Sequence, residues 1–362
     1  MTPPASPRIG LVLGAGGITG FAYHAGVLSA LGRLTGWDPR TADVIVGTSA
    51  GSGVGAMLRG GVPVDEVLAH LLAAPSNPET MTRLRVLSGR EFNSPSWLWF
   101  GPGSPRLLLE ELRKPWKLRP SRLATALIPN GRIPTEFLGD RARQLHALDW
   151  PDESYWVCAM RLSDGQRVVF GRNEADIAAA SSDAHGDVGI DVAGVDVGTA
   201  VEASSAIPGF FQPVWIHSER YIDGAIHSPT NADLIGSQEL DLDLVVIVSP
   251  MSGECRPAVR SMDALSRLTS GNTLKREVAG LRDMGHEVLV LEPGAEEIQT
   301  MGPINMDPTR MVPTVLQASA STLQRLVDPR YEDALATLQE AADATTSPPV
   351  VPYPEEVTSR IS

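Results

Sequence analysis

The sequence predicts an α/β fold with a mainly parallel central sheet, and two observations favour it. Residues 8–13 (RIGLVL) and 42–46 (ADVIV) are short, almost fully apolar runs, as expected for strands that are buried on both faces. Each run is followed by a glycine-containing turn and then by a helical pattern, at 20–34 and at 50–58. Strand, turn and helix repeated in this order are typical of parallel strands joined by crossover helices.

The remaining elements continue this alternation along the chain. Further strands are expected at 155–162, 166–170, 214–217, 244–248 and 287–291, and helices at 64–73, 107–114, 135–145, 197–205, 262–282 and 310–326. A chain of 362 residues with 43% hydrophobic residues is sufficient for one large core. We therefore expect a single domain over residues 8–330, followed by a C-terminal helix and a proline-rich tail over 331–362.

The composition excludes several classes of protein. Charged residues make up 20% of the chain, and 34 glycines and 29 prolines are spread along it, which argues against a coiled coil, a fibrous repeat or a wholly disordered chain. The net charge of −13 argues against nucleic acid as a partner. Two cysteines, Cys158 and Cys255, cannot form a disulfide framework, and the seven histidines are scattered without metal-site spacing. We expect no metal, no cofactor, and either a reducing compartment or no disulfide at all, and the 27 arginines against three lysines suggest a bacterial source.

Residues 9–32 contain no charged side chain, and this stretch has two interpretations. It is long enough for a membrane span or for the apolar region of a signal peptide. However, it holds seven glycines, four of them within residues 14–20, which would interrupt a spanning helix. We expect a buried strand, a glycine-rich loop and a helix, with His24 in the core or at its rim.

The motif Gly47-Thr48-Ser49-Ala50-Gly51 carries the strongest chemical signal in the sequence. It is a G-x-S-x-G pattern between an apolar strand and a helix, which is the setting of a nucleophilic serine on a sharp turn. Gly47 and Gly51 leave room for such a turn, and the free N–H groups at the start of the helix favour negative charge beside the serine. The motif predicts Ser49 as a nucleophile, against the alternative of a structural glycine turn.

A second glycine-rich segment, residues 14–20 (GAGGITG), follows the first strand. Its spacing is close to the dinucleotide motif G-x-G-x-x-G, but the position of the third glycine is occupied by Thr19. The alternative is an oxyanion hole, in which a glycine-rich turn directs several N–H groups at one point. A nucleophile motif on the neighbouring strand favours the oxyanion hole over a dinucleotide-binding oxidoreductase.

A nucleophilic serine needs a base, and the sequence offers two kinds. Histidines are present late in the chain as His217, His227 and His286, but none has a recognisable catalytic context. Asp223 comes directly after an apolar strand and before Gly224, where a tight turn would hold its carboxylate beside the serine. An Asp-Gly pair after a strand is by itself most often a plain turn.

Together these motifs resemble the patatin-like phospholipases, a family of serine acyl hydrolases. Three blocks match in order: LVLGAGGITG with the following FAYHAGVLSAL, then IVGTSAG, then ASSAIPGFFQP with YIDGAIHSPTNADL. They fall within residues 8–234, and neither residues 83–132 nor the C-terminal third of the chain matches a motif. The resemblance implies a three-layer α/β sandwich and a Ser–Asp dyad without histidine, in which Ser49 is the nucleophile and Asp223 the base. It assigns the oxyanion hole to Ala15, Gly16 and Gly17.

Two positions depart from the family's usual loop, which reads G-G-G-x-(Arg/Lys)-G. Ala15 stands at a glycine position, and Thr19 stands at the basic one. Alanine keeps the backbone N–H, so its oxyanion role depends on whether the local backbone accepts a Cβ. The missing cation removes one candidate for orienting an anionic group of the substrate.

Residues 83–132 form a basic segment, with ten Lys or Arg against three acids, and Trp97, Trp99 and Phe100 lie among them. This composition suits a lid or an interfacial segment that contacts an anionic membrane. The alternative is an ordinary helical subdomain whose aromatic side chains pack inward. Binding to anionic vesicles that salt weakens would favour membrane contact, and equal binding to neutral vesicles would favour inward packing.

Two segments near the motifs are assigned structural roles. Residues 204–213 are expected to shape the turn beside the serine. Asn231 and Asp233 follow the Asp-Gly turn and are expected to cap the next helix.

The sequence therefore predicts a serine acyl hydrolase that cleaves carboxylic esters of lipids, of the phospholipase A, lysophospholipase or lipase type. An acyltransferase on the same dyad and a non-catalytic lipid-binding protein of the same fold are the alternatives. The expected partner is a lipid or another acyl ester. The expected location is the cytoplasm, with or without peripheral membrane contact, and the sequence indicates no oligomeric state.

Overall fold

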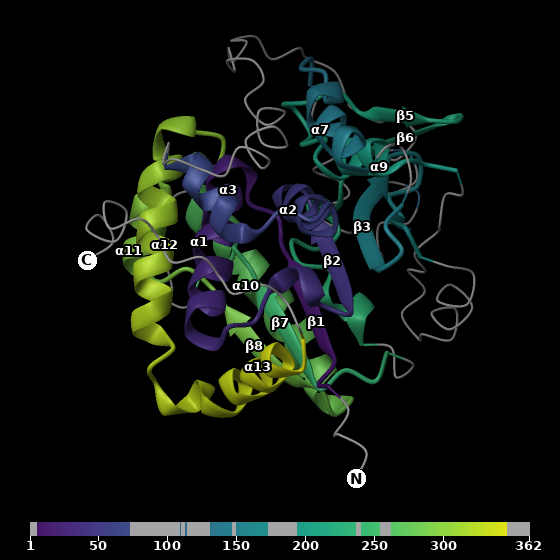
Figure 1. Cartoon of the computed structure of the whole chain (residues 1–362). Helices are drawn as coiled ribbons and strands as arrows, with labels where there is room; N and C mark the ends of the chain where they lie inside the picture. Colours follow the sequence, from purple (N-terminus) through teal and green to yellow (C-terminus); the bar gives the residue numbers. More distant parts are fainter. Residues whose placement is uncertain are drawn as a thin grey trace.

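A mixed sheet of eight strands forms the centre of the molecule (Figure 1). The computed structural model describes residues 6–72, 131–146, 150–172, 194–236, 240–253 and 262–345, together with residues 109 and 113. The strands are β1 (Ile9–Leu13), β2 (Val44–Thr48), β3 (Ser154–Arg161), β4 (Arg167–Phe170), β5 (Val214–Ile216), β6 (Glu219–Asp223), β7 (Leu244–Val248) and β8 (Glu287–Leu291). The described helices are α1 (Gly17–Thr35), α2 (Ala50–Arg59), α3 (Val64–Leu71), α7 (Glu136–His146), α9 (Val197–Ser204), α10 (Met262–Asp283), α11 (Ala295–Met301), α12 (Met311–Arg325) and α13 (Glu332–Ala344).

The larger part of the sheet is parallel. β8, β7, β1, β2 and β3 pair in this order and run in the same direction. β6 pairs antiparallel with β3 and with β5, and β4 also pairs antiparallel with β3. The predicted α/β fold with a mainly parallel sheet is therefore confirmed, with antiparallel strands added at β3.

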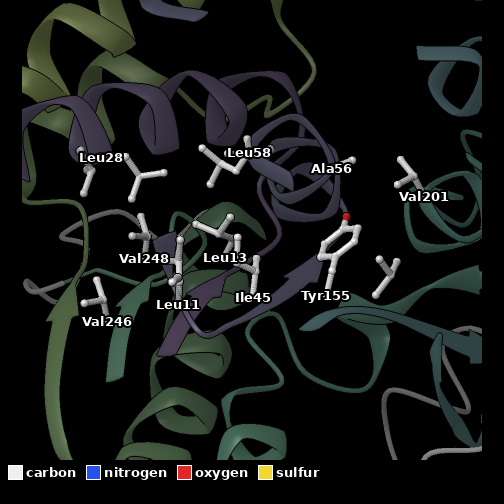
Figure 2. Packing of buried hydrophobic residues seen from close by; sticks show 14 of the residues in the cluster. Leu11, Leu13, Leu28, Ile45, Ala56, Leu58, Tyr155, Val201, Val246 and Val248 are labelled. Carbon is white, nitrogen blue, oxygen red and sulfur yellow. The ribbon is translucent and has the colours of Figure 1, made fainter. Parts of the chain in front are cut away.

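The strands of the parallel part are buried on both faces, so their residues alternate between two cores. Leu11 and Leu13 face a cluster with α1 and α2, whereas Val12 between them faces a second cluster with α10. Figure 2 shows the first cluster, in which Leu28 and Leu58 lie over the strand residues. Helices on both faces of the sheet give the three layers that the sequence predicts.

The uncharged stretch 9–32 consists of the buried strand β1, the loop after it and most of α1, as the strand–loop–helix interpretation predicts. Its glycines allow close packing, since a Cβ at Gly26 would lie 2.6 Å from the carbonyl oxygen of Val315 in α12. His24 is fully buried, and its Nε2 lies 2.7 Å from the carbonyl oxygen of Gly14. Burial lowers the pKa of His24 to about 4, so it is a neutral core residue at pH 7.

None of the described helices is both long and apolar enough to cross a membrane.

Most predicted elements are found within a few residues of their expected bounds, and α13 lies where a C-terminal helix is expected. The short helix α11 is absent from the prediction, because seven residues (AEEIQTM) give no clear periodicity. Several predicted features lie outside the described residues: the helix at 107–114 as a whole, nearly all of the basic segment, Trp97, Trp99, Phe100, Cys255 and the proline-rich tail. The membrane-contact prediction therefore stays a prediction.

Candidate active site

Ser49 lies at the junction of β2 and α2 in a backbone conformation that few side chains adopt. Its φ is 54° and its ψ is −119°, and positive φ is strained for residues other than glycine. The flanking glycines make this turn possible. A Cβ at Gly51 would lie 2.0 Å from the carbonyl oxygen of Leu13, and a Cβ at Gly47 would lie 2.7 Å from the Cα of Ser52. Ser49 is thus held at the N-terminus of α2, as the motif predicts.

The pairing of β3 brings Asp223 next to Ser49. Residues 157 and 158 of β3 pair with both β2 and β4, and residues 159 and 160 pair with both β4 and β6. Because a strand residue has one neighbour on each side, β2 and β6 share one edge of β3 and lie end to end. Thr48 is opposite Cys158, and Asp223 is opposite Ala159, so the two strand ends meet beside consecutive residues of β3.

Ser49 and Asp223 form a buried pair. The carboxylate of Asp223 accepts the backbone N–H of Ala225 at 2.8 Å and interacts with the hydroxyl of Ser49. Burial raises the pKa of Asp223 from 3.8 to about 6, against the lowering effect of these two hydrogen bonds. The turn after it requires Gly224, since a Cβ there would lie 2.4 Å from the carbonyl oxygen of Cys158. Above pH 6 the carboxylate is therefore an available base beside a hydroxyl group.

Ser204, at the end of α9, connects the serine turn to β3. Its Oγ accepts the backbone N–H of Ser49 at 2.9 Å and donates to the carbonyl oxygen of Cys158 at 2.6 Å. Ser204 is fully buried, so water does not compete for these contacts. From the sequence, segment 204–213 is expected only to shape the turn. The strand pairing gives the hydroxyl of Ser204 these two hydrogen bonds. Nothing in the local sequence distinguishes Ser204 from the adjacent Ser205.

The loop between β1 and α1 offers two of the three predicted oxyanion donors. The amide of Ala15 donates to the carbonyl oxygen of Pro229 at 2.8 Å, so it is already occupied, and the predicted oxyanion role of Ala15 is corrected to a structural one. In the described part of the chain, the amides of Gly16 and Gly17 have no acceptor. Gly17 lines the same cavity as Ser49, which leaves the two glycines as the predicted donors.

Segment 305–308 packs against this loop. Thr19 is fully buried and donates its amide to the carbonyl oxygen of Asn305 at 3.1 Å. Gly17 has a φ of 59°, and a Cβ there would lie 2.8 Å from the same oxygen, so glycine is required. The position where the family usually has a cation is thus a buried neutral residue.

The loop after Asp223 is fixed by the carboxylate of Glu277 in α10. Its oxygens accept the hydroxyls of Ser228 and Thr230, each at 2.5 Å, and the amide of Ala232 at 3.1 Å. Pro229 lies between Ser228 and Thr230, and its carbonyl oxygen accepts the hydrogen bond from the amide of Ala15 in the glycine-rich loop. Glu277 therefore links α10 to the loops on both sides of the site, and nothing in its local sequence indicates this role.

Asn231 stands at the N-cap position of the short helical turn Ala232–Ile235, and Asp233 lies in its first turn, but the side chain of Asn231 makes no capping hydrogen bond. Instead, the amide of Asn231 donates to the hydroxyl of Thr48 at 3.1 Å, at the end of β2. The carboxylate of Asp233 pairs with Arg167 on β4 at 2.7 Å. The prediction of a side-chain cap by Asn231 is therefore wrong, because its amide donates to Thr48 and to the carbonyl oxygen of Ser228, the latter at 2.7 Å.

An apolar cavity of about 690 Å³ opens at Ser49. The wall includes Phe21, Met57, Leu71, Leu138, Val201 and Met311, from α1, α2, α3, α7, α9 and α12. Its size and apolar lining are those of a site for an acyl chain or a similar apolar ligand. Among its lining residues, all from the described ranges, Arg141 carries the only formal charge, and none is histidine.

The described residues show no metal site, since no three His, Cys, Asp or Glu side chains among them gather to hold an ion. Cys158 is fully buried on β3, and burial raises the pKa of its thiol to about 12. At neutral pH it is an uncharged core residue and a poor nucleophile.

A large part of the chain matches a known family. The profile of the family described as "Patatin-like phospholipase" matches residues 11–235, which is more than half of the chain. The chain belongs to the patatin-like phospholipase family. The serine turn, the glycine-rich loop and the Asp-Gly turn all lie within the matched residues, and the family is one of lipid acyl hydrolases.

Other comparisons are more distant. No curated protein sequence matches the chain. Among solved structures, the chain is similar to VipD from Legionella pneumophila, with 13% sequence identity and a TM-score of 0.34, over 94% of this chain and 75% of that one.

Substitution of Gly51 by alanine tests the close approach of α2 to β1. We expect Gly51→Ala to lower the free energy of unfolding by about 2 kcal/mol or more, because the new Cβ overlaps the carbonyl of Leu13. Gly53→Ala in the same helix is the matched control, because a Cβ there meets no atom within 4 Å. It should leave stability unchanged or raise it by about 0.5–1 kcal/mol. Equal denaturation midpoints for the two variants would contradict the packing described here.

Proposed function

We propose that this patatin-like protein is a serine acyl hydrolase that cleaves carboxylic ester bonds of lipids. Ser49 acts as the nucleophile, and Asp223 acts as its base. The observation that carries the proposal is the contact of the Ser49 hydroxyl with a buried carboxylate, at the wall of an apolar cavity of about 690 Å³. Such a cavity places the ester of a bound acyl chain near the serine while excluding water from the chain itself.

In the first half of the reaction, the Oγ of Ser49 attacks the ester carbonyl carbon while its proton moves to the carboxylate of Asp223. The carbonyl oxygen becomes an oxyanion, and the amides of Gly16 and Gly17 donate hydrogen bonds to it. Collapse of this intermediate breaks the bond to the leaving alcohol. The alcohol takes the proton from Asp223, and an acyl group remains on Ser49.

In the second half, water attacks the acyl-serine carbonyl, and Asp223 accepts the proton that the water loses. The same two amides stabilise the second oxyanion. When it collapses, the carboxylic acid leaves, and the proton returns from Asp223 to Oγ of Ser49. The free enzyme is restored with no net change in charge or oxidation state.

The raised pKa of Asp223 explains how a carboxylate can act without a histidine. An ordinary aspartate is a weak base at neutral pH, because its pKa is about 4. Burial moves this pKa to about 6, closer to the working pH, which strengthens the base while leaving most of it ionised. No histidine lines the cavity within the described ranges, so the carboxylate is the base that this site offers.

Covalent labelling with a fluorophosphonate ester probe tests the dyad. The wild-type protein should bind one probe, and mass spectrometry should locate it on Ser49 rather than on Ser205, which also lines the cavity. Ser49→Ala should abolish labelling, and Asp223→Asn should reduce the rate of ester hydrolysis by about a thousandfold or more.

Two outcomes would contradict the proposal: labelling of Ser49→Ala at the wild-type rate, or full esterase activity in Asp223→Asn. Product analysis separates the alternatives of the same fold. An added alcohol that diverts product from acid to ester would identify an acyltransferase. Saturable lipid binding without labelling or turnover would identify a non-catalytic lipid-binding protein.

The pH dependence of hydrolysis follows from the pKa of Asp223. Protonated Asp223 cannot accept the serine proton, so kcat/KM should rise with pH through a midpoint of about 6 and level off above pH 7. The profile should be measured on a soluble short-chain ester, with circular dichroism at each pH to confirm that the protein stays folded. A flat profile between pH 5 and 7.5, or a midpoint near 8, would show that another group is the base.

A further inference from the structure

Of the described residues that line the cavity beside Ser49, one carries a formal charge. This residue is Arg141, which is half-buried. Among the described residues, no carboxylate forms an ion pair with this guanidinium, and no carbonyl or side chain accepts a hydrogen bond from it. Burial lowers the pKa of Arg141, and no neighbouring charge raises it again.

The position of Arg141 follows from the pattern of α7. Phe137, Leu138, Arg141, Ala142 and Leu145 recur at helical spacing, and all line the cavity. The face of α7 that borders the cavity is therefore apolar except for this one residue. A leucine or methionine would complete that face, so the arginine is not needed for packing.

Arg143, two residues further along the same helix, shows the contrasting case. Its guanidinium pairs with Glu202 at 2.7 Å, with Asp196 at 3.1 Å and with Asp140 at 3.1 Å. These pairs join α7 to α9 and give Arg143 a structural role. Among the residues that the structure describes, no carboxylate pairs with Arg141, so the two arginines of α7 lie in different surroundings.

A guanidinium keeps its proton at any physiological pH, so Arg141 stays charged within an apolar surround. Removing a charge from water without a partner costs free energy, and a bound anion would recover that cost. The planar fork of arginine matches the paired oxygens of a phosphate or a carboxylate. The cavity therefore offers an anion a site that is already partly desolvated.

We propose that Arg141 binds an oxyanion carried by the acyl lipid that occupies the cavity, and that it makes the site selective for anionic over neutral lipids. This rests on the proposed function for the place of the acyl chain. The oxyanion has two sources, the phosphate of a lipid headgroup or the carboxylate of a released fatty acid. Arg141 thereby supplies, from α7, the positive charge that the buried Thr19 cannot supply from the glycine-rich loop.

The test is a binding measurement on the full chain carrying Ser49→Ala, which removes turnover. Calorimetric Kd values would be obtained for three ligands with the same acyl chain, below their critical micelle concentrations: a lysophosphatidate, a fatty acid and a monoacylglycerol. Arg141→Met is compared with Arg276→Met, which removes an equal charge from the exposed face of α10. Arg141→Gln serves as a second variant, and thermal denaturation confirms that each protein is folded.

We expect Arg141→Met to weaken binding of the lysophosphatidate, the fatty acid or both by about tenfold to a hundredfold, as for loss of a charged hydrogen bond. Weaker binding of the lysophosphatidate identifies a headgroup phosphate as the anion, and weaker binding of the fatty acid identifies a product carboxylate. Arg276→Met should change no Kd by more than about twofold.

Equal weakening of monoacylglycerol binding, or anionic ligands that bind Arg141→Met and Arg141→Gln as they bind the parent, would overturn the inference. The binding measurement and the hydrolysis measurement can fail separately. A wild-type protein that fails to hydrolyse any ester would contradict the hydrolase proposal and leave the anion preference of Arg141 standing.

Discussion

The placement of β2 and β6 end to end along one edge of β3 is the constraint on which the site depends. It sets Thr48 and Asp223 beside consecutive residues of β3, although they are far apart in the sequence. The carbonyl of Cys158 lies at the meeting point, where it accepts the hydroxyl of Ser204 and excludes a side chain at position 224. Ser204 in turn holds the amide of Ser49. A change in the register of β6 by one residue would turn Asp223 to the other face of the sheet.

The burial of the Ser49–Asp223 pair raises the pKa of Asp223, and it does so at a cost in stability. Because the folded state raises the pKa of Asp223 from 3.8 to about 6, it favours the protonated form. With respect to this group the fold is most stable below pH 3.8, and it loses on the order of 3 kcal/mol as pH rises through 6. The strained φ of Ser49 adds a local cost at the same place. The parallel strands of the sheet are buried on both faces, and this burial stabilises the fold against both costs.

Much of the fold and the centre of the site could be predicted from the sequence, because both depend on local patterns. Apolar runs identify the strands, and the G-x-S-x-G spacing identifies the turn at Ser49, whereas the selection of Asp223 depended on the resemblance to the patatin-like phospholipases. Three features could not be predicted, because they depend on contacts between residues far apart in the sequence. They are the hydrogen bond from Ser204 to β3, the hydrogen bonds that Glu277 accepts, and the hydrogen bond from the amide of Ala15 to Pro229. The role proposed for Arg141 could not be predicted for a similar reason. Arg141 differs from Arg143 only in the groups that the fold places around it.

A crystal structure of the protein after reaction with a phosphonate ester tests the central claim most directly. The account predicts phosphorus bonded to the Oγ of Ser49, with one phosphonate oxygen about 3 Å from the amide nitrogens of Gly16 and Gly17. Asp223 should remain beside Ser49 at the shared edge of β3, and the amide of Ala15 should still bind Pro229. A phosphonate oxygen directed away from both glycine amides, or an Asp223 carboxylate separated from Ser49 in the adduct, would contradict it.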